Sequence, residues 1–174
     1  MNRKNYLCVL LGVSGLLVSG IASAEPFNRY MTFQGALTDK DGFDGGLGGV
    51  ATYGIRVPEM HKNFSVEAEA TSTLVEPKGT VAGTTWEASY YTLGGYGVYS
   101  HPLSEKFHLR GRLGVLYKNV QVSSPTESKK EDGFELSYGL GFTVGLGEAS
   151  RFILEYTVLD THINNFSAGV QFKL

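Results

Sequence analysis

Thiols, charged residues and long apolar runs are scarce in this sequence of 174 residues. The single cysteine, Cys8, lies close to the start of the chain, so neither disulfides nor thiol chemistry is expected beyond it. Charged residues make up 18% of the chain, below the ~25% of ordinary soluble domains. The formal net charge of -2 argues against a nucleic-acid-binding protein.

The start of the chain has the composition of an export signal. Arg3 and Lys4 precede a short apolar stretch, and small residues lead up to Ala24. Glycine and serine interrupt the apolar stretch, which falls short of the ~20 residues that a membrane-spanning helix needs. We therefore predict a cleaved signal peptide over residues 1–24 and a single domain over residues 25–174.

Glycine, in contrast, is abundant, and in the longest regular segment it alternates with apolar residues. Between Phe134 and Gly147 one parity holds Phe, Leu, Tyr and Val, while the other holds mostly glycine together with Glu135, Ser137 and Thr143. A helix would scatter these apolar residues around its circumference, whereas a strand places them on one face. The segment is therefore predicted to be a long strand with two different faces.

The same period of two recurs along the chain and predicts an all-β fold. The predicted strands are Arg29–Thr38, Leu47–Val57, Phe64–Thr71, Thr84–Ser100, Phe107–Lys118, Phe134–Gly147, Arg151–Asp160 and Phe166–Leu174. Most connections alternate between tight turns and longer polar loops, the longer ones being Asp39–Gly46, Glu76–Gly83 and Ser123–Asp132. Short turns at one end and longer loops at the other are typical of outer-membrane barrels.

Alternation alone leaves two classes of eight-stranded barrel open, because it does not say which face points inward. In a soluble barrel of the lipocalin type the polar parity would meet water, where glycine weakens a strand. In a membrane barrel the glycines would face a narrow interior and leave room for larger polar groups. Aromatic residues near strand ends, such as Phe107, Tyr117 and Phe134, are typical of membrane interfaces. We therefore predict an eight-stranded antiparallel up-and-down transmembrane β-barrel.

Charged residues on the inward parity are predicted to form a network inside this barrel. The predicted members are Glu67, Glu69, Arg110, Arg112, Lys118, Glu135 and Glu155. Opposite charges at such positions can satisfy one another's hydrogen bonds. Two interpretations remain: a polar plug that orders the barrel, or the gate of a narrow pore.

Three segments carry a resemblance to a known family. They are FELSYGLGFTVGLG (residues 134–147), YTLGGYGVYSHPLSEKFHLRGRLGVLY (91–117) and NFSAGVQFKL (165–174). Together they resemble the small outer-membrane β-barrel family, which includes the transmembrane domain of outer membrane protein A and the opacity-type surface proteins of Gram-negative bacteria. The resemblance implies export to the cell outer membrane and a structural or surface-interaction role, in adhesion or envelope integrity. A narrow low-conductance pore is the alternative, and a lipid-modifying outer-membrane enzyme is a third.

The resemblance also implies partners and an assembly signal. Outer-membrane lipid and lipopolysaccharide would surround the barrel, and the loops could contact host or surface ligands. The residues themselves leave two interpretations for Lys129 and Lys130: contact with lipopolysaccharide phosphates, or a solvated loop tip shared with Glu127, Glu131 and Asp132. The barrel assembly machinery and periplasmic chaperones would take part in biogenesis. Family barrels usually end in an aromatic residue, whereas this chain ends in a leucine. The corresponding assembly signal is the outward parity of the last strand: Phe166, Val170, Phe172 and Leu174.

Catalytic, metal and cofactor sites are not predicted. None of the four histidines has a serine two residues on, the spacing expected from resemblance to the lipid A deacylases; they are His61, His101, His108 and His162. Asp39 and Asp41 are similar to the start of a calcium loop, but Phe43 and Val50 occupy positions that need oxygen ligands. We expect neither enzymatic activity nor a bound cofactor.

Overall fold

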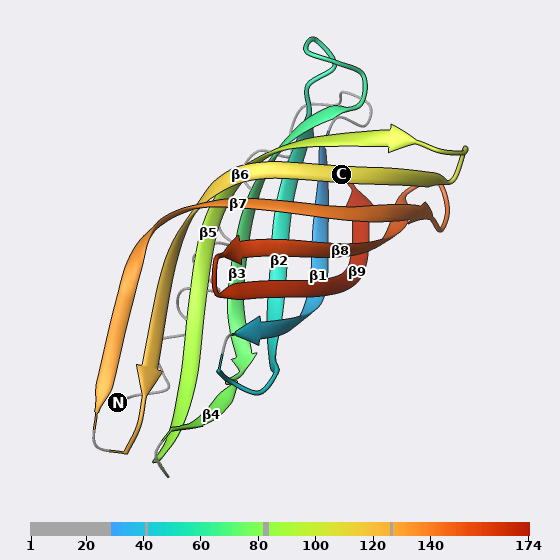
Figure 1. The fold of residues 1–174 in the computed structure, drawn as a ribbon. Helices are drawn as coiled ribbons and strands as arrows, with labels where there is room; N and C mark the ends of the chain where they lie inside the picture. The colour runs from blue at the N-terminus through green and yellow to red at the C-terminus, as the bar shows by residue number, and fades with distance from the viewer. Residues whose placement is uncertain (1–28, 41, 82–83, 126) are drawn as a thin grey trace.

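A computed structural model describes residues 29–40, 42–81, 84–125 and 127–174, which fold into antiparallel β-sheet (Figure 1). None of these residues belongs to a helix long and apolar enough to cross a membrane. The predicted signal peptide, residues 1–24, lies outside the described residues.

The strands follow one another around a closed barrel in chain order. They are β1 (Arg29–Lys40), β2 (Gly46–Arg56), β3 (Phe64–Val75), β4 (Lys78–Val81), β5 (Thr84–Pro102), β6 (Phe107–Ser123), β7 (Ser128–Gly145), β8 (Ser150–Asp160) and β9 (Ile163–Lys173). Pairing of β1 with β9 and of β3 with β5 closes the wall, whereas the short β4 pairs only with β5. The wall therefore has eight antiparallel strands, which confirms the predicted fold.

The two ends of the barrel differ. Both ends of the described chain and the turns β2–β3, β5–β6 and β7–β8 lie at one end, which we call the termini end. The other end, the loop end, holds the connections β1–β2, β6–β7 and β8–β9, and the β4 hairpin. The chain runs furthest beyond the closed wall at the loop end, where Ser128–Ser137 pair with β6 alone. Because outer-membrane barrels extend furthest on the extracellular side, the termini end corresponds to the periplasmic one.

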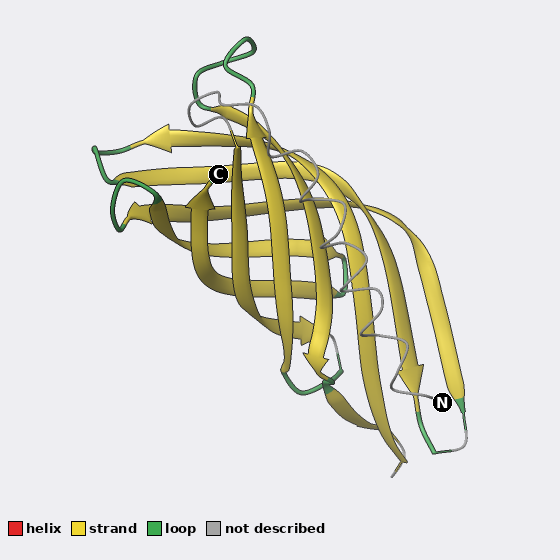
Figure 2. Ribbon diagram, turned by 180° about the vertical axis from the view of Figure 1, so that it is seen from behind, coloured by secondary structure: helices red, strands yellow, loops and turns green. Residues whose placement is uncertain are grey.

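Strands β5, β6 and β7 extend past the rest of the wall at the loop end (Figures 1 and 2). Pairing of β7 with β8 begins only at Tyr138, so Ser128–Ser137 pair with β6 alone and leave one edge of β7 unpaired. We call this projecting sheet the arm. It comprises residues 78–81, 84–90, 119–125 and 127–137.

The arm differs from the loops expected in this region. The sequence predicts loops over Glu76–Gly83 and Ser123–Asp132, but the structure places Lys78–Val81 and Ser128–Asp132 in strands. The charged residues of β7 pair across the arm with a β6 segment that contains Val120 and Val122. Valine favours strands, and the partner strand supplies the backbone hydrogen bonds that a polar composition does not reveal.

The apolar parity faces outward, as predicted for a transmembrane barrel. Along β7, Leu136 and Leu140 are 64% and 68% exposed, whereas Ser137 between them is fully buried. Gly141 shows why glycine is needed inside: a Cβ there would lie 2.4 Å from the carbonyl oxygen of Leu154 on β8. The apolar side chains of β7 therefore meet the lipid, and its inward face holds small and polar residues.

Candidate functional site

The middle of the lumen holds five charged side chains that pair with one another. From β6, Arg110 Nε lies 2.6 Å from Glu155 Oε2 of β8, and both Arg110 Nη atoms bind the carboxylate of Glu67 on β3. Arg112 Nη1 lies 2.6 Å from Glu69 Oε2 and 2.7 Å from Glu155 Oε1. All five side chains are buried. We call them the ion network.

The pairing follows from strand register. Residues two apart on a strand share a face, so Arg110 and Arg112 point into the lumen together, as do Glu67 and Glu69. Strands β3 and β8 each lie two strands away from β6 around the wall, on opposite sides of it. The two guanidinium groups therefore reach toward both sides and tie Glu67 and Glu69 to Glu155 across the lumen.

Neutral groups complete the ion network, which has three carboxylates for two guanidinium groups. The Tyr30 hydroxyl donates to Glu67, Thr52 donates to Glu69 at 3.3 Å, and Thr157 donates to Glu155 at 3.2 Å. The Arg112 guanidinium lies 3.6 Å from the centre of the Tyr96 ring, which favours its charge. Removing water from five charges is costly, so this degree of pairing is what makes their burial possible.

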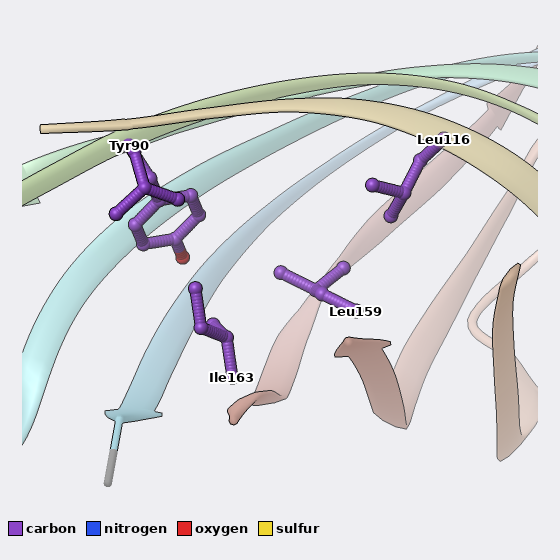
Figure 3. Packing of buried hydrophobic residues seen from close by; sticks show 5 residues of the cluster. Tyr90, Leu116, Leu159 and Ile163 are labelled. Carbon is purple, nitrogen blue, oxygen red and sulfur yellow. The ribbon is translucent and has the colours of Figure 1, made fainter. Parts of the chain in front are cut away.

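Toward the loop end the lumen is filled by apolar side chains (Figure 3). Tyr90, Leu116, Val120, Leu159 and Ile163 pack together from β5, β6, β8 and β9. The Tyr90 hydroxyl lies 2.6 Å from Thr38 Oγ1 and 3.1 Å from Asn165 Oδ1. The ion network and this apolar cluster together fill successive parts of the lumen.

Lys118 forms a second charged group near the outer mouth. Its Nζ lies 2.7 Å from Asp160, 3.0 Å from Glu131 and 3.2 Å from Glu135. Glu135 was predicted to lie inside, and its side chain is 39% exposed at the mouth. Asp160 was not expected as a partner, because its inward placement depends on an irregular register between β8 and β9.

At the termini end the lumen opens into a hollow of about 90 Å³. We call it the vestibule, and its charged and aromatic lining includes Tyr30, Arg56, Lys62, His108, Arg110 and Arg151. No carboxylate is among the described residues that line it. Arg56 and Arg151 were not singled out from the sequence, yet they continue the inward parity of Gly54 and Ile153, which was the available signal.

Tyr30 contacts both the vestibule and the ion network. Its hydroxyl binds Glu67 and Ser65, while its ring lines the vestibule. A Cβ at Gly54 would lie 2.2 Å from the Tyr30 ring, so only glycine lets the ring lie across that strand. The ring thus lies at the end of the ion network that faces the vestibule, where Arg110 also lines the hollow.

The proposed assembly signal lies on the outer face of β9. Phe166, Phe172 and Leu174 are exposed, and Val170 is half-buried. The backbone amide of Leu174 donates to the carbonyl oxygen of Arg29 at 3.0 Å, so the end of the chain stays next to β1. This outward surface is available to lipid.

The four histidines are spread over the barrel. His61 and His101 are exposed at the termini end, where the His61 ring lies 5.3 Å from that of Tyr99. His108 faces the vestibule, and His162 lies in the turn after Asp160, to which its backbone amide donates at 2.6 Å. Among the described residues there is no group of three or more side chains suited to hold a metal ion.

The arm carries charges of both signs on its surface. Lys78 Nζ lies 2.8 Å from Glu87 Oε1, and this hydrogen bond lowers the pKa of the Glu87 carboxyl. Lys129 Nζ lies 5.9 Å from the centre of the Trp86 ring and 3.5 Å from Glu127. Such exposed ion pairs add little to the stability of the protein. The charged and aromatic side chains of the arm are therefore not needed to hold the fold together.

Comparisons with known proteins agree with this geometry. The family model described as the outer membrane protein beta-barrel domain matches residues 8–173. Among curated protein sequences, none is similar enough to this chain to count as a match.

Solved barrels share the fold at low sequence identity. The attachment invasion locus protein Ail of Yersinia pestis is 16% identical with a TM-score of 0.56, over 84% of this chain and 96% of Ail. A second Ail structure contains the heparin analogue sucrose octasulfate. Neisserial surface protein A is 13% identical with a TM-score of 0.62, over 87% and 99% of the two chains. OprG from Pseudomonas aeruginosa is 15% identical with a TM-score of 0.59, over 85% and 96%.

Proposed function

This chain belongs to the outer membrane protein β-barrel domain family, and we propose that it is a surface-interaction protein whose barrel anchors the arm in the outer membrane. The observation that carries the proposal is the arm itself, which extends past the wall of a barrel whose lumen is filled. A filled lumen supports an anchoring role, because side chains occupy the space that a channel would need.

The arm has the properties of a contact surface. One edge of β7 leaves backbone groups of Ser128–Ser137 without a neighbouring strand, and such an edge can accept a strand from a partner. Charged side chains along it, including Lys129 and Lys130, limit unspecific pairing and can bind lipopolysaccharide phosphates. Ail, whose name refers to attachment and invasion, has a similar fold, and this supports a surface-interaction role for the present chain.

The remaining parts of the proposal concern biogenesis and chemistry. Residues 1–24 would be removed on export from the cytoplasm of a Gram-negative cell, and the barrel assembly machinery, aided by periplasmic chaperones, would insert the chain through its last strand. We propose no enzymatic activity. The scattered histidines support this view, because nucleophilic catalysis needs a nucleophile and base within hydrogen-bond reach.

Shortening the arm tests the proposal. Residues 121–130 are replaced by Asn-Gly, a two-residue hairpin turn that joins the paired positions Val120 and Glu131. Bacteria that display this variant should lose adherence to cultured epithelial cells or lose autoaggregation. The matched control, Lys62→Gln with Lys106→Gln, also removes two lysines but at the termini end, and it should leave both properties unchanged. Unchanged adherence and aggregation in the shortened variant would contradict a contact role for the arm.

Planar-bilayer recordings separate the anchor from the alternative, a narrow pore. The filled lumen should give only small, infrequent openings, and shortening the arm should not change them. Large steady conductance would refute the plug, and the ion network would then be the gate.

A further inference from the structure

We propose that the vestibule is a binding site for a phosphate group that enters from the periplasm. This site lies at the opposite end of the barrel from the arm, so it does not depend on the surface-interaction function. The argument rests on where the cations of the vestibule point, what compensates them, and how much space they enclose.

Two arginines, a lysine and a histidine approach the vestibule from several sides of the wall. Arg56 comes from β2, His108 from β6 and Arg151 from β8, and all three continue the inward parity of their strands. Lys62 reaches the same hollow from the β2–β3 turn. A small anion placed between them would be contacted from different directions.

The charge of the vestibule is not balanced by the protein. The Arg110 guanidinium is paired with Glu67 and Glu155, but Arg56 and Arg151 form no ion pair or hydrogen bond with any described residue, and their charges repel each other. Carboxylates at this end belong to turns, among them Glu59 and Glu148, and do not line the hollow. An anion would therefore relieve a repulsion that the fold leaves in place.

The hydrogen-bonding groups suit a tetrahedral oxyanion. Each free guanidinium is a planar fork that can bind two oxygens of one phosphate, and the Lys62 ammonium adds a point charge. His108 Nδ1 is buried and has no hydrogen-bond partner among the described residues, although it faces the same hollow. Phosphate is favoured over a carboxylate because its higher charge matches several cations at once.

The volume selects a small group. A hollow of about 90 Å³ has room for a phosphate group together with ordered water. The group could belong to a soluble periplasmic phosphate or to a phospholipid headgroup. Because Arg56 and Arg151 lie on the inward parity of their strands and not on the lipid-facing one, the soluble source is favoured.

Calorimetry on the full-length mature protein, folded in a maltoside detergent, tests the site with inorganic phosphate at constant ionic strength. We expect saturable binding at one site, weakened by more than about tenfold in Arg56→Gln with Arg151→Gln because charge-assisted hydrogen bonds are lost. The charge-keeping pair Arg56→Lys with Arg151→Lys should bind with intermediate affinity. Heat-modifiable migration on a gel verifies that each variant is folded.

The matched control removes two cations that do not line the vestibule, Lys40→Gln with Lys106→Gln, and changes net charge equally. It should bind phosphate as the parent does. No saturable binding, full binding in the double arginine-to-glutamine variant, or an equal loss in the control would each overturn the proposal.

A second arm of the experiment distinguishes the sources of phosphate. In nanodiscs of phosphatidylglycerol or of phosphatidylcholine, equal phosphate affinity supports a soluble ligand. Weaker affinity in phosphatidylglycerol, restored when the acidic lipid is diluted, supports occupation of the same site by a lipid headgroup.

Discussion

Two neighbouring layers of the lumen hold arginine in opposite ways. In the ion network, Arg110 and Arg112 are buried and paired with three glutamates. In the vestibule, Arg56 and Arg151 face the same lumen without a carboxylate, in a hollow that Tyr30 and Arg110 also line. Buried charges must be paired, whereas charges near water need not be, so the unpaired cations of the vestibule remain available to a ligand.

The largest effect is expected where the ion network is broken. Glu155→Ala should lower the free energy of unfolding by about 3–5 kcal/mol, because it leaves two buried guanidinium groups short of a carboxylate. Urea titration in phospholipid vesicles, followed by heat-modifiable migration, measures the loss. Glu148→Ala, in an exposed turn, is the control and should have no effect. A loss no larger than that of the control would show that the network does not stabilise the barrel.

A second prediction tests the assignment of inside and outside on which the comparison depends. Leu140→Arg should cost about 2–4 kcal/mol by placing a charge in the lipid near the middle of the wall. Its neighbour Gly141→Leu should cost about 1–3 kcal/mol for the opposite reason, crowding against β8. The same titration measures both, with Leu140→Phe as the tolerated control. If both substitutions are silent, the two faces are misassigned.

Tyr30, at the boundary between the layers, should affect one layer and not the other. Tyr30→Phe removes the hydroxyl that donates to Glu67 and should cost about 1.5 kcal/mol of unfolding free energy. The ring remains, so calorimetry should give unchanged phosphate affinity. Tyr53→Phe, on the outward parity of β2, serves as the control for loss of a hydroxyl. A change in phosphate affinity without a change in stability would contradict the assignment of the Tyr30 hydroxyl to the ion network.

The smallest effect is expected for the vestibule. Arg56→Gln with Arg151→Gln should change the free energy of unfolding by less than about 1 kcal/mol, since no ion pair with a described residue is lost and a repulsion is relieved. The contrast is with Arg110→Gln, which should cost several kcal/mol by the same titration. Equal losses for the two variants would mean that both layers are structural.

The alternation of residue types along the sequence was sufficient to predict most strands of the wall. The alternation from Phe134 to Gly147 predicted both the strand and the face that each residue occupies, because side chains of a strand alternate whatever its partners are. The same parity argument indicated inward positions for Arg110 and Arg112. The unpaired edge of the arm was not predicted, because it depends on where β8 stops pairing with β7.

The contacts within the lumen could not be predicted from this alternation alone. Lys118 was expected inside, but its partner Asp160 was not expected, since an irregular register between β8 and β9 places it there. The vestibule was missed for a related reason. Arg56 and Arg151 lie in weakly alternating segments, far apart in the chain, and only closure of the wall gathers them.

By itself the sequence determined the strands, the outward apolar surface and the supply of charge for the interior, because the period of two is a local property of extended backbone. Only the tertiary structure decided which charge meets which. Pairing of β1 with β9 and of β3 with β5 sets the register around the ring, and that register balances the arginines of one layer and leaves those of the next without a carboxylate.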